Sequence, residues 1–261
     1  MPRGRPRRQP IHSPEPAFID LTECEEDQGD KPESPVKILA TINGNQITDK
    51  HCQILLCEYE WLNDEIVNSF SARVSRLTPD VHCCSSFFFT KLSRGIDVEW
   101  LERWKNSADA PRKRLIFVPV NWGNSHWALL VYNVREAVLN YYDSMMNPGR
   151  SREALAGVKG AFEAIKLFPI KDEEPVGVLA FIMSKMSIDR SSGEDLRLDG
   201  PTRIKTETPK NQPQQTDGSS CGVYLCWWVE KLANPTTAEH KNTPNIREYR
   251  RHILDMLLDQ R

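Results

Sequence analysis

Four residues of this sequence provide the parts of a cysteine acyl-transfer site: Cys221, His126, Asp143 and Gln215. A thiol attacks a carbonyl as the thiolate, so it needs an imidazole to take its proton and a third group to orient that ring. The oxyanion that forms needs hydrogen-bond donors. We therefore predict Cys221 as the nucleophile, His126 as the base and Asp143 as the group that orients it. Gln215 is predicted to donate to the oxyanion beside the backbone N–H of Cys221.

The surroundings of Cys221 favour a reactive thiol. A polar, turn-forming run at 214–220 precedes it, and an apolar run at 223–229 follows Gly222. This pattern predicts that Cys221 begins a buried helix, where unpaired N–H groups and the helix dipole favour an anion. The alternative is a buried structural cysteine, an interpretation that suits Cys226 inside the apolar run.

His126 and Asp143 are predicted at the ends of neighbouring strands. Apolar, branched runs on either side of a turn are typical of a hairpin, and a third such run ends at Asp143. Each residue taken alone could instead be a hydrogen-bonded histidine or a turn aspartate. The predicted strands are 115–120, 127–132 and 138–142, with the turn at 121–125.

Six motifs of the chain resemble those of the SUMO-specific (sentrin-specific) cysteine proteases. They occur in that family's order and at similar spacings, and the resemblance covers about residues 45–258. The motifs lie at 61–66, 87–92, 118–120, 126–127, 141–145, and 214–215 with 221–222.

The resemblance implies an α+β, papain-like cysteine protease fold, with the nucleophile on a helix packed against an antiparallel sheet. It implies cleavage after the C-terminal Gly-Gly of a ubiquitin-like modifier, from its precursor or from a lysine side chain. It also assigns Trp61 and Trp127 to the walls of a narrow tunnel, where two indoles leave room only for glycine. Trp61 could otherwise be a core aromatic residue.

Two features depart from the family pattern. Ser220 precedes the predicted nucleophile, where the family has Asp, and this change affects loop geometry or rate more than mechanism. The stretch 171–209 is longer than in compact members of the family. It could be a family loop, a regulatory insertion or a mis-predicted coding segment, and we expect it to be poorly packed.

The chain of 261 residues, 39% of them hydrophobic, predicts one protease domain at 41–261 and a disordered tail at 1–40. No apolar run reaches the length of a membrane span, and the first residues lack the apolar stretch of a secretory signal. Seven cysteines without a C-x-x-C pair indicate a reducing compartment, and we expect no metal and no cofactor. Apolar residues at helical spacing predict three helices that each turn one face to the core. The first face has Ile66, Val67, Phe70, Val74 and Leu77; the second has Leu155, Val158, Phe162 and Ile165; the third has Ile246, Tyr249, Ile253 and Leu257.

The tail contains two short signals. Arg3, Arg5, Arg7 and Arg8 resemble an AT-hook core that contacts the minor groove of A·T-rich DNA. A nuclear-localisation patch or a solubilising basic end would look the same. The second signal, in which acidic residues follow Ile19, Asp20, Leu21 and Thr22, resembles a SUMO-interaction motif that adds a strand to the modifier's sheet edge.

The sequence therefore predicts a nuclear or nucleocytoplasmic SUMO-specific cysteine isopeptidase. A NEDD8-specific isopeptidase would use the same triad and tunnel. A catalytically inactive adaptor that binds the modifier is the alternative from another class, and Ser220 keeps it open.

Overall fold

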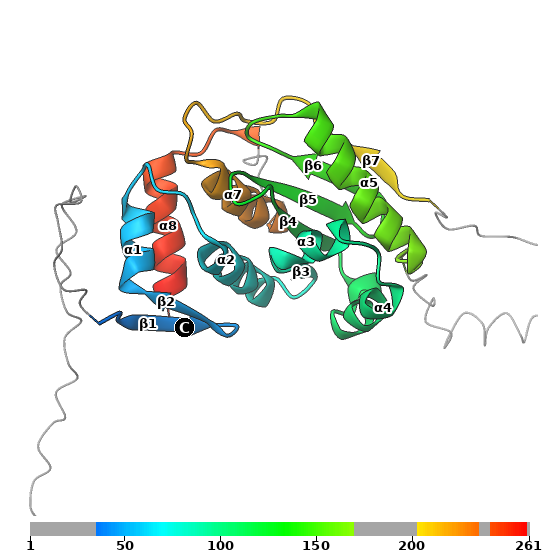
Figure 1. The fold of residues 1–261 in the computed structure, drawn as a ribbon, viewed down its shortest axis with the longest axis horizontal. Helices are drawn as coiled ribbons and strands as arrows, with labels where there is room; N and C mark the ends of the chain where they lie inside the picture. Colours follow the sequence, from blue (N-terminus) through cyan, green and yellow to red (C-terminus); the bar gives the residue numbers. More distant parts are fainter. Residues whose placement is uncertain (1–34, 170–202, 235–240, 260–261) are drawn as a thin grey trace, which may run out of the picture. The chain divides into compact units, whose positions relative to one another are not determined.

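A five-stranded sheet with helices on both faces forms the frame of the protein (Figure 1). A computed structural model describes residues 35–169, 203–234 and 241–259. The strand order is β3-β4-β5-β6-β7, and β1 and β2 form a separate antiparallel hairpin. The strands are β1 (Ile38–Ile42), β2 (Asn45–Thr48), β3 (Val81–Cys83), β4 (Leu115–Asn121), β5 (Trp127–Asn133), β6 (Val138–Tyr142) and β7 (Lys205–Glu207).

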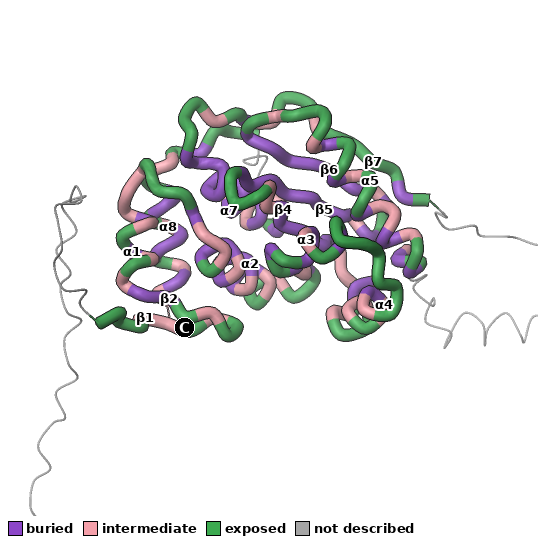
Figure 2. Tube along the Cα trace, in the orientation of Figure 1, coloured by how far each residue is buried: buried purple, intermediate pink, exposed green. Residues whose placement is uncertain are grey.

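Alternating residues of the central strands supply two hydrophobic cores, because successive side chains of a strand point to opposite faces. In β5, Leu129 and Val131 pack in the core that contains α2, α7 and α8, whereas Leu130 and Tyr132 pack in the core that contains α3, α4 and α5. Strands β4 to β6 and helix α7 are accordingly the most buried parts of the trace (Figure 2). The helices are α1 (Asp49–Leu56), α2 (Asp64–Leu77), α3 (Phe87–Ser93), α4 (Val98–Ser107), the 3-10 helix η1 (Ala110–Arg112), α5 (Pro148–Ala164), α7 (Cys221–Ala233) and α8 (Ile246–Leu258).

Asparagine and aspartate side chains fix the starts of several helices. Asn63 accepts a hydrogen bond from the N–H of Ile66 at 3.1 Å and so caps α2, directly after the Trp61–Leu62 pair. Asp97, Asn147 and Asn245 cap α4, α5 and α8 in the same way. Asp64 in the first turn of α2 adds a favourable charge at the positive end of the helix dipole.

The predicted hairpin and third strand are confirmed, since β4, β5 and β6 pair antiparallel in that order. The predicted helix that begins at Cys221 is α7. The central strands form the expected antiparallel sheet, and β3 and β7 extend it at its two edges in parallel, so that the whole sheet is mixed. A parallel pair needs a long crossover, and the segment with α3, α4 and η1 provides it between β3 and β4.

Three further expectations need correction. Strand β1 begins at Ile38, inside the range assigned to the tail. Ile204 is buried and β7 joins the sheet, so the last part of 171–209 is packed, while 171–202 lies outside the described residues. Leu77 is 60% exposed because it is the last residue of α2, beyond the edge of the core.

Gly222 allows helix α7 to approach Leu62, which precedes α2, and Trp127, which begins β5. A Cβ at Gly222 would lie 2.9 Å from Leu62 Cβ and 3.2 Å from Trp127 Cδ1. Contacts of 2.9 Å between carbon atoms are repulsive, so only glycine fits here without a shift of backbone or side chain. The start of α7, and Cys221 with it, is therefore held by this packing.

We expect Gly222→Ala to lower the free energy of unfolding by about 1–3 kcal/mol, the usual range for overpacking a core site. Chemical denaturation measures this change. Gly157→Ala is the matched control, because a Cβ at this exposed position in α5 meets nothing within 4 Å. It should leave stability unchanged or raise it by about 0.5–1 kcal/mol. Equal effects of the two substitutions would contradict the packing argument.

Candidate active site

The antiparallel pairing of β5 with β6 brings His126 and Asp143 together. His126 directly precedes β5 and Asp143 directly follows β6, and the register pairs Leu129 with Tyr142. The turn before β5 is closed by a hydrogen bond from the N–H of Trp122 to the carbonyl of His126 at 2.8 Å. Two residues separated by 17 positions in the chain thus meet where the two paired strands β5 and β6 begin and end.

The carboxylate of Asp143 is fully buried, and hydrogen bonds satisfy both of its oxygens. His126 Nε2 donates to Oδ1 at 2.7 Å, and the N–H of Met145 donates to the same oxygen at 2.8 Å. The Tyr141 hydroxyl donates to Oδ2 at 3.0 Å, and Trp122 Nε1 donates in turn to the Tyr141 oxygen at 3.3 Å. The imidazole ring therefore has a fixed orientation, with Nε2 bound and Nδ1 directed elsewhere.

The environment favours a charged imidazole next to a charged carboxylate. Burial disfavours the charged form of His126, but the hydrogen bond with Asp143 and the interactions with the charges of Asp143 and Cys221 outweigh it and raise the pKa of His126 to about 9. Burial also opposes the charge of Asp143. The hydrogen bonds from His126, Met145 and Tyr141 outweigh it and hold the pKa of this carboxyl below its usual value.

Cys221 is the first residue of α7 and only 3% exposed. Its thiol interacts with the imidazole of His126 and contributes to the raised pKa. Because Nε2 is bonded to Asp143, and Nδ1 is buried without another hydrogen bond among the described residues, Nδ1 is the nitrogen that can take a proton from Cys221. The position of Cys221 at the start of α7 is also the positive end of the helix dipole.

Three glutamines tie the loop before α7 to the end of β6. Gln212 accepts from the N–H of Asp143 at 2.9 Å and donates to the carbonyl of Tyr141 at 2.8 Å. Gln214 donates to the carbonyl of Asp143 at 3.0 Å. The N–H of Gln215 donates to the carbonyl of Ser144 at 3.0 Å. The loop with Cys221 and the strand with Asp143 are thus connected directly.

Asp217 organises the turn between Gln215 and Cys221. Its Oδ1 accepts the N–H groups of Ser219 and Ser220, each at 2.8 Å. Burial opposes its charge, but these hydrogen bonds outweigh it and lower its pKa. Ser220, at the position where the family has Asp, is buried and makes no capping hydrogen bond with its side chain. The negative charge of this loop is carried by Asp217 instead.

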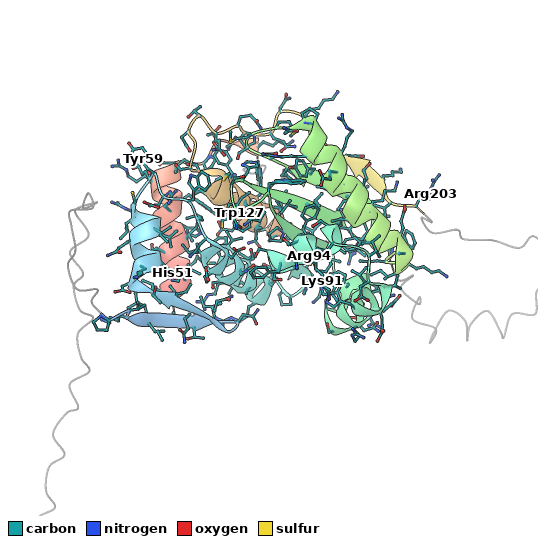
Figure 3. All side chains as sticks on the ribbon, in the orientation of Figure 1. His51, Tyr59, Lys91, Arg94, Trp127 and Arg203 are labelled. Atoms are coloured by element: carbon teal, nitrogen blue, oxygen red, sulfur yellow. The ribbon has the colours of Figure 1, made fainter. Side chains whose placement is uncertain are left out.

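Trp127 lies beside the start of α7, near the middle of the domain (Figure 3). Its indole N–H donates to the carbonyl of Leu62 at 2.8 Å, and its ring would be 3.2 Å from a Cβ at Gly222. Leu62 follows Trp61, which is 48% exposed. The hydrogen bond therefore holds the Trp61–Leu62 segment next to Trp127 and close to Cys221.

The structure brings together the residues predicted for the catalytic site and the two predicted tunnel tryptophans, whose roles stay predictions. The tail residues predicted to bind SUMO or DNA lie outside the described residues. Sequence reasoning missed Gln212, Tyr141 and Asp217, which hold the site, and the hydroxyl of Ser144. Only their proximity in the chain to Asp143 and Cys221 could have indicated them.

Within 35–169, 203–234 and 241–259, no three His, Cys, Asp or Glu side chains are grouped to hold a metal ion. No helix in these segments is both long and apolar enough to cross a membrane.

Comparison with known families gives one match that covers most of the chain. The model of the Ulp1 protease family, C-terminal catalytic domain, matches residues 60–257. Sentrin-specific protease 2 from Mus musculus is 28% identical over 222 residues, which are 82% of this chain and 33% of that protein. Ubiquitin-like-specific protease 1 from Saccharomyces cerevisiae is 27% identical over 204 residues, 76% of this chain and 28% of that protein. The chain spans about a third of the length of the curated relatives it matches.

Solved structures share the fold. The X-ray structure of the C-terminal Ulp1 protease domain in complex with Smt3, the yeast ortholog of SUMO, aligns with a TM-score of 0.63 at 24% identity. The alignment covers 87% of this chain and 89% of that one. The Ulp1-like SUMO protease catalytic domain of Chaetomium thermophilum aligns with a TM-score of 0.60 at 17% identity, covering 86% and 84%. These likenesses confirm the predicted α+β fold.

We expect Asp143→Asn to lower the pKa of His126 from about 9, because burial that disfavours the imidazolium remains while the compensating charge is lost. An NMR titration of the imidazole measures this shift. His82 serves as the internal control, since burial and Lys113 lower its pKa to about 4 and Asp143 takes no part.

The same pKa fixes the direction of the stability change with pH. Because folding raises the pKa of His126 above the unfolded value of 6.5, the stabilisation is complete below that pH and is lost as pH rises through about 9. A His126 pKa that does not respond to Asp143→Asn would contradict this account.

Proposed function

Because this chain belongs to the Ulp1 protease family, we propose that it is a cysteine protease that cleaves after the C-terminal Gly-Gly of SUMO. It releases SUMO from substrate lysines, processes its precursor, or does both. The observation that carries the proposal is the buried His126–Asp143 pair next to Cys221 at the start of α7. The relatives named as sentrin-specific proteases and the relative solved with Smt3 support SUMO as the modifier.

The proposed reaction follows from the roles of these side chains. The proton of Cys221 is held on Nδ1 of His126, in keeping with the charged imidazole, and the thiolate sulfur attacks the carbonyl carbon of the terminal glycine. The oxyanion accepts hydrogen bonds from the N–H of Cys221 and from Nε2 of Gln215. His126 then protonates the departing amine, which leaves a thioester. Water, deprotonated by His126, attacks the thioester and regenerates the thiol while the carboxylate leaves.

Two other functions are candidates for this chain. NEDD8 is the second candidate modifier, because the same triad and tunnel serve a modifier that ends in Gly-Gly. A catalytically inactive adaptor is the other, because Ser220 replaces an acidic residue beside Cys221. The intact set of Cys221, His126, Asp143 and Gln215 supports catalysis.

We expect SUMO with a C-terminal electrophile to form a covalent adduct with the wild-type protein, faster than NEDD8 or ubiquitin with the same group. Cys221→Ser should abolish the adduct and retain reversible binding of SUMO. Cys226→Ser is the control, since this thiol lies inside α7, where burial raises its pKa. Mass spectrometry detects the adducts. An adduct with the Cys221→Ser protein would refute the assignment of the nucleophile, and a preference for NEDD8 would change the substrate.

Trp61 and Trp127 are proposed to select glycine next to the cleaved bond, because two indole walls leave no room for a β-carbon. A substrate that ends in Gly-Ala should therefore lose more transition-state stabilisation than the ~1–3 kcal/mol typical of one methylene in a plain pocket. Trp61→Ala, at a half-exposed position, should reduce this discrimination without unfolding the protein. Ratios of kcat/KM for the two substrates measure it. Equal turnover of both substrates by the wild type would exclude a tunnel.

The tail is proposed to bind SUMO rather than to take part in cleavage. Ile19, Asp20, Leu21 and Thr22, followed by acidic residues, suit a strand added to a basic sheet edge. We also propose that the tail arginines make a weak contact with A·T-rich DNA. The location proposed for the protein is nuclear or nucleocytoplasmic. Titration of a peptide of residues 1–40 into labelled SUMO and NEDD8 tests it, and equal binding to both would argue against SUMO selectivity.

A further inference from the structure

Ser144 makes a hydrogen bond to the side chain proposed to stabilise the oxyanion. Its side chain is buried directly after Asp143, and its Oγ donates to Gln215 Oε1 at 2.6 Å. This bond is separate from the one between the backbones of the two residues, in which the N–H of Gln215 donates to the carbonyl of Ser144. The hydroxyl therefore acts on the amide group of Gln215 and not on the path of the chain.

The direction of this hydrogen bond is fixed by a second one. Gln215 Nε2 donates to the carbonyl of Asp217 at 2.7 Å. A carbonyl oxygen can only accept, so the NH2 group of the amide must face Asp217 and the oxygen must face Ser144. The serine hydroxyl must then be the donor. Nε2 has a second N–H, which makes no hydrogen bond to a residue that the structure describes.

We infer that Ser144 is a positioning residue that keeps this second N–H of Gln215 directed at the oxyanion. The inference rests on the proposed function. The hydrogen bond from Ser144 prevents the amide from rotating and polarises it, since an amide whose oxygen accepts a hydrogen bond is a stronger donor at its nitrogen. Ser144 thus connects the strand end that carries Asp143 to the group that receives the developing charge.

Other hydrogen bonds hold the loop whether or not Ser144 has a hydroxyl. Gln212 and Gln214 bind the backbone of Asp143 on both sides, and the backbone bond between Gln215 and Ser144 needs no side chain. Ser144→Ala should therefore leave the fold and the His126–Asp143 pair intact. The substitution should affect only the orientation of the Gln215 side-chain amide.

The first measurement separates oxyanion stabilisation from thiol reactivity. We expect Ser144→Ala to lower kcat for release of a C-terminal amide from SUMO on the order of tenfold, with KM unchanged. Loss of the oxyanion donor itself in Gln215→Ala should cost more, about 10²–10³-fold. Alkylation of Cys221 by iodoacetamide forms no oxyanion, so its rate should be the same in the wild type and both variants. A slower alkylation in Ser144→Ala would overturn the inference.

A double-mutant cycle tests whether Ser144 acts through Gln215. In the Gln215→Ala background, Ser144→Ala should cause no further loss of kcat. The same tenfold loss in both backgrounds would overturn the inference. Ser151→Ala is the matched control, because the Ser151 side chain is also buried and its hydroxyl bonds to the Thr208 hydroxyl, at 3.0 Å, and not to Gln215. It should leave kcat unchanged.

A third measurement does not depend on catalysis. The order parameter of the Gln215 side-chain NH2 group, from 15N relaxation, should fall in Ser144→Ala and not in Ser151→Ala. An unchanged order parameter would overturn the inference while the proposed function stands. A wild-type protein that cleaves no modifier would overturn the proposed function, and the order parameter would still decide whether Ser144 holds Gln215.

Discussion

The buried carboxylate of Asp143 is the constraint on which the rest of the site depends. A charge removed from water must be compensated by hydrogen bonds and an opposite charge, and Tyr141, Met145 and His126 provide them here. These partners come from the ends of two strands and from the turn that follows. A slip of one residue between β5 and β6 would turn Asp143 to the other face of the sheet. The charge therefore fixes the strand register as well as the imidazole ring.

In the segment before α7, a side chain continues the hydrogen bonding to β6 beyond the point where β7 ends. β7 pairs with β6 from Val138 to Asn140. Beyond that point Gln212 accepts from the N–H of Asp143 and donates to the carbonyl of Tyr141, as a neighbouring strand would. This arrangement attaches the cysteine loop to β6 without a strand. It allows the loop to turn at Asp217 and to deliver Cys221 to the start of α7.

The sequence predicted the parts of this arrangement that depend on local patterns. Apolar runs around a polar turn determine the β4–β5 hairpin, and a polar loop before an apolar run determines where α7 begins. The parallel edges of the sheet and the burial of Ile204 were not predictable, because they depend on pairings between distant segments. Gln212 and Ser144 were missed for the same reason. A glutamine or serine in a loop has no periodicity, and its role follows only from the partner that the fold places beside it.

The burial of the catalytic residues bears on two kinds of specificity, one for the bond that is cleaved and one for the modifier that is bound. Cys221, His126 and Asp143 are almost fully buried, and Leu62 and Trp127 pack so closely against Gly222 that a Cβ at this residue does not fit. The proposed Gly-Gly substrate suits a thiol that is only 3% exposed, because glycines carry no side chain. Glycines offer few contacts of their own, so the binding energy must come from parts of the modifier remote from the cleaved bond. Under the proposed function, selection of the bond depends on the buried surroundings of Cys221, whereas selection among modifiers that end in Gly-Gly depends on the outer surface of the domain.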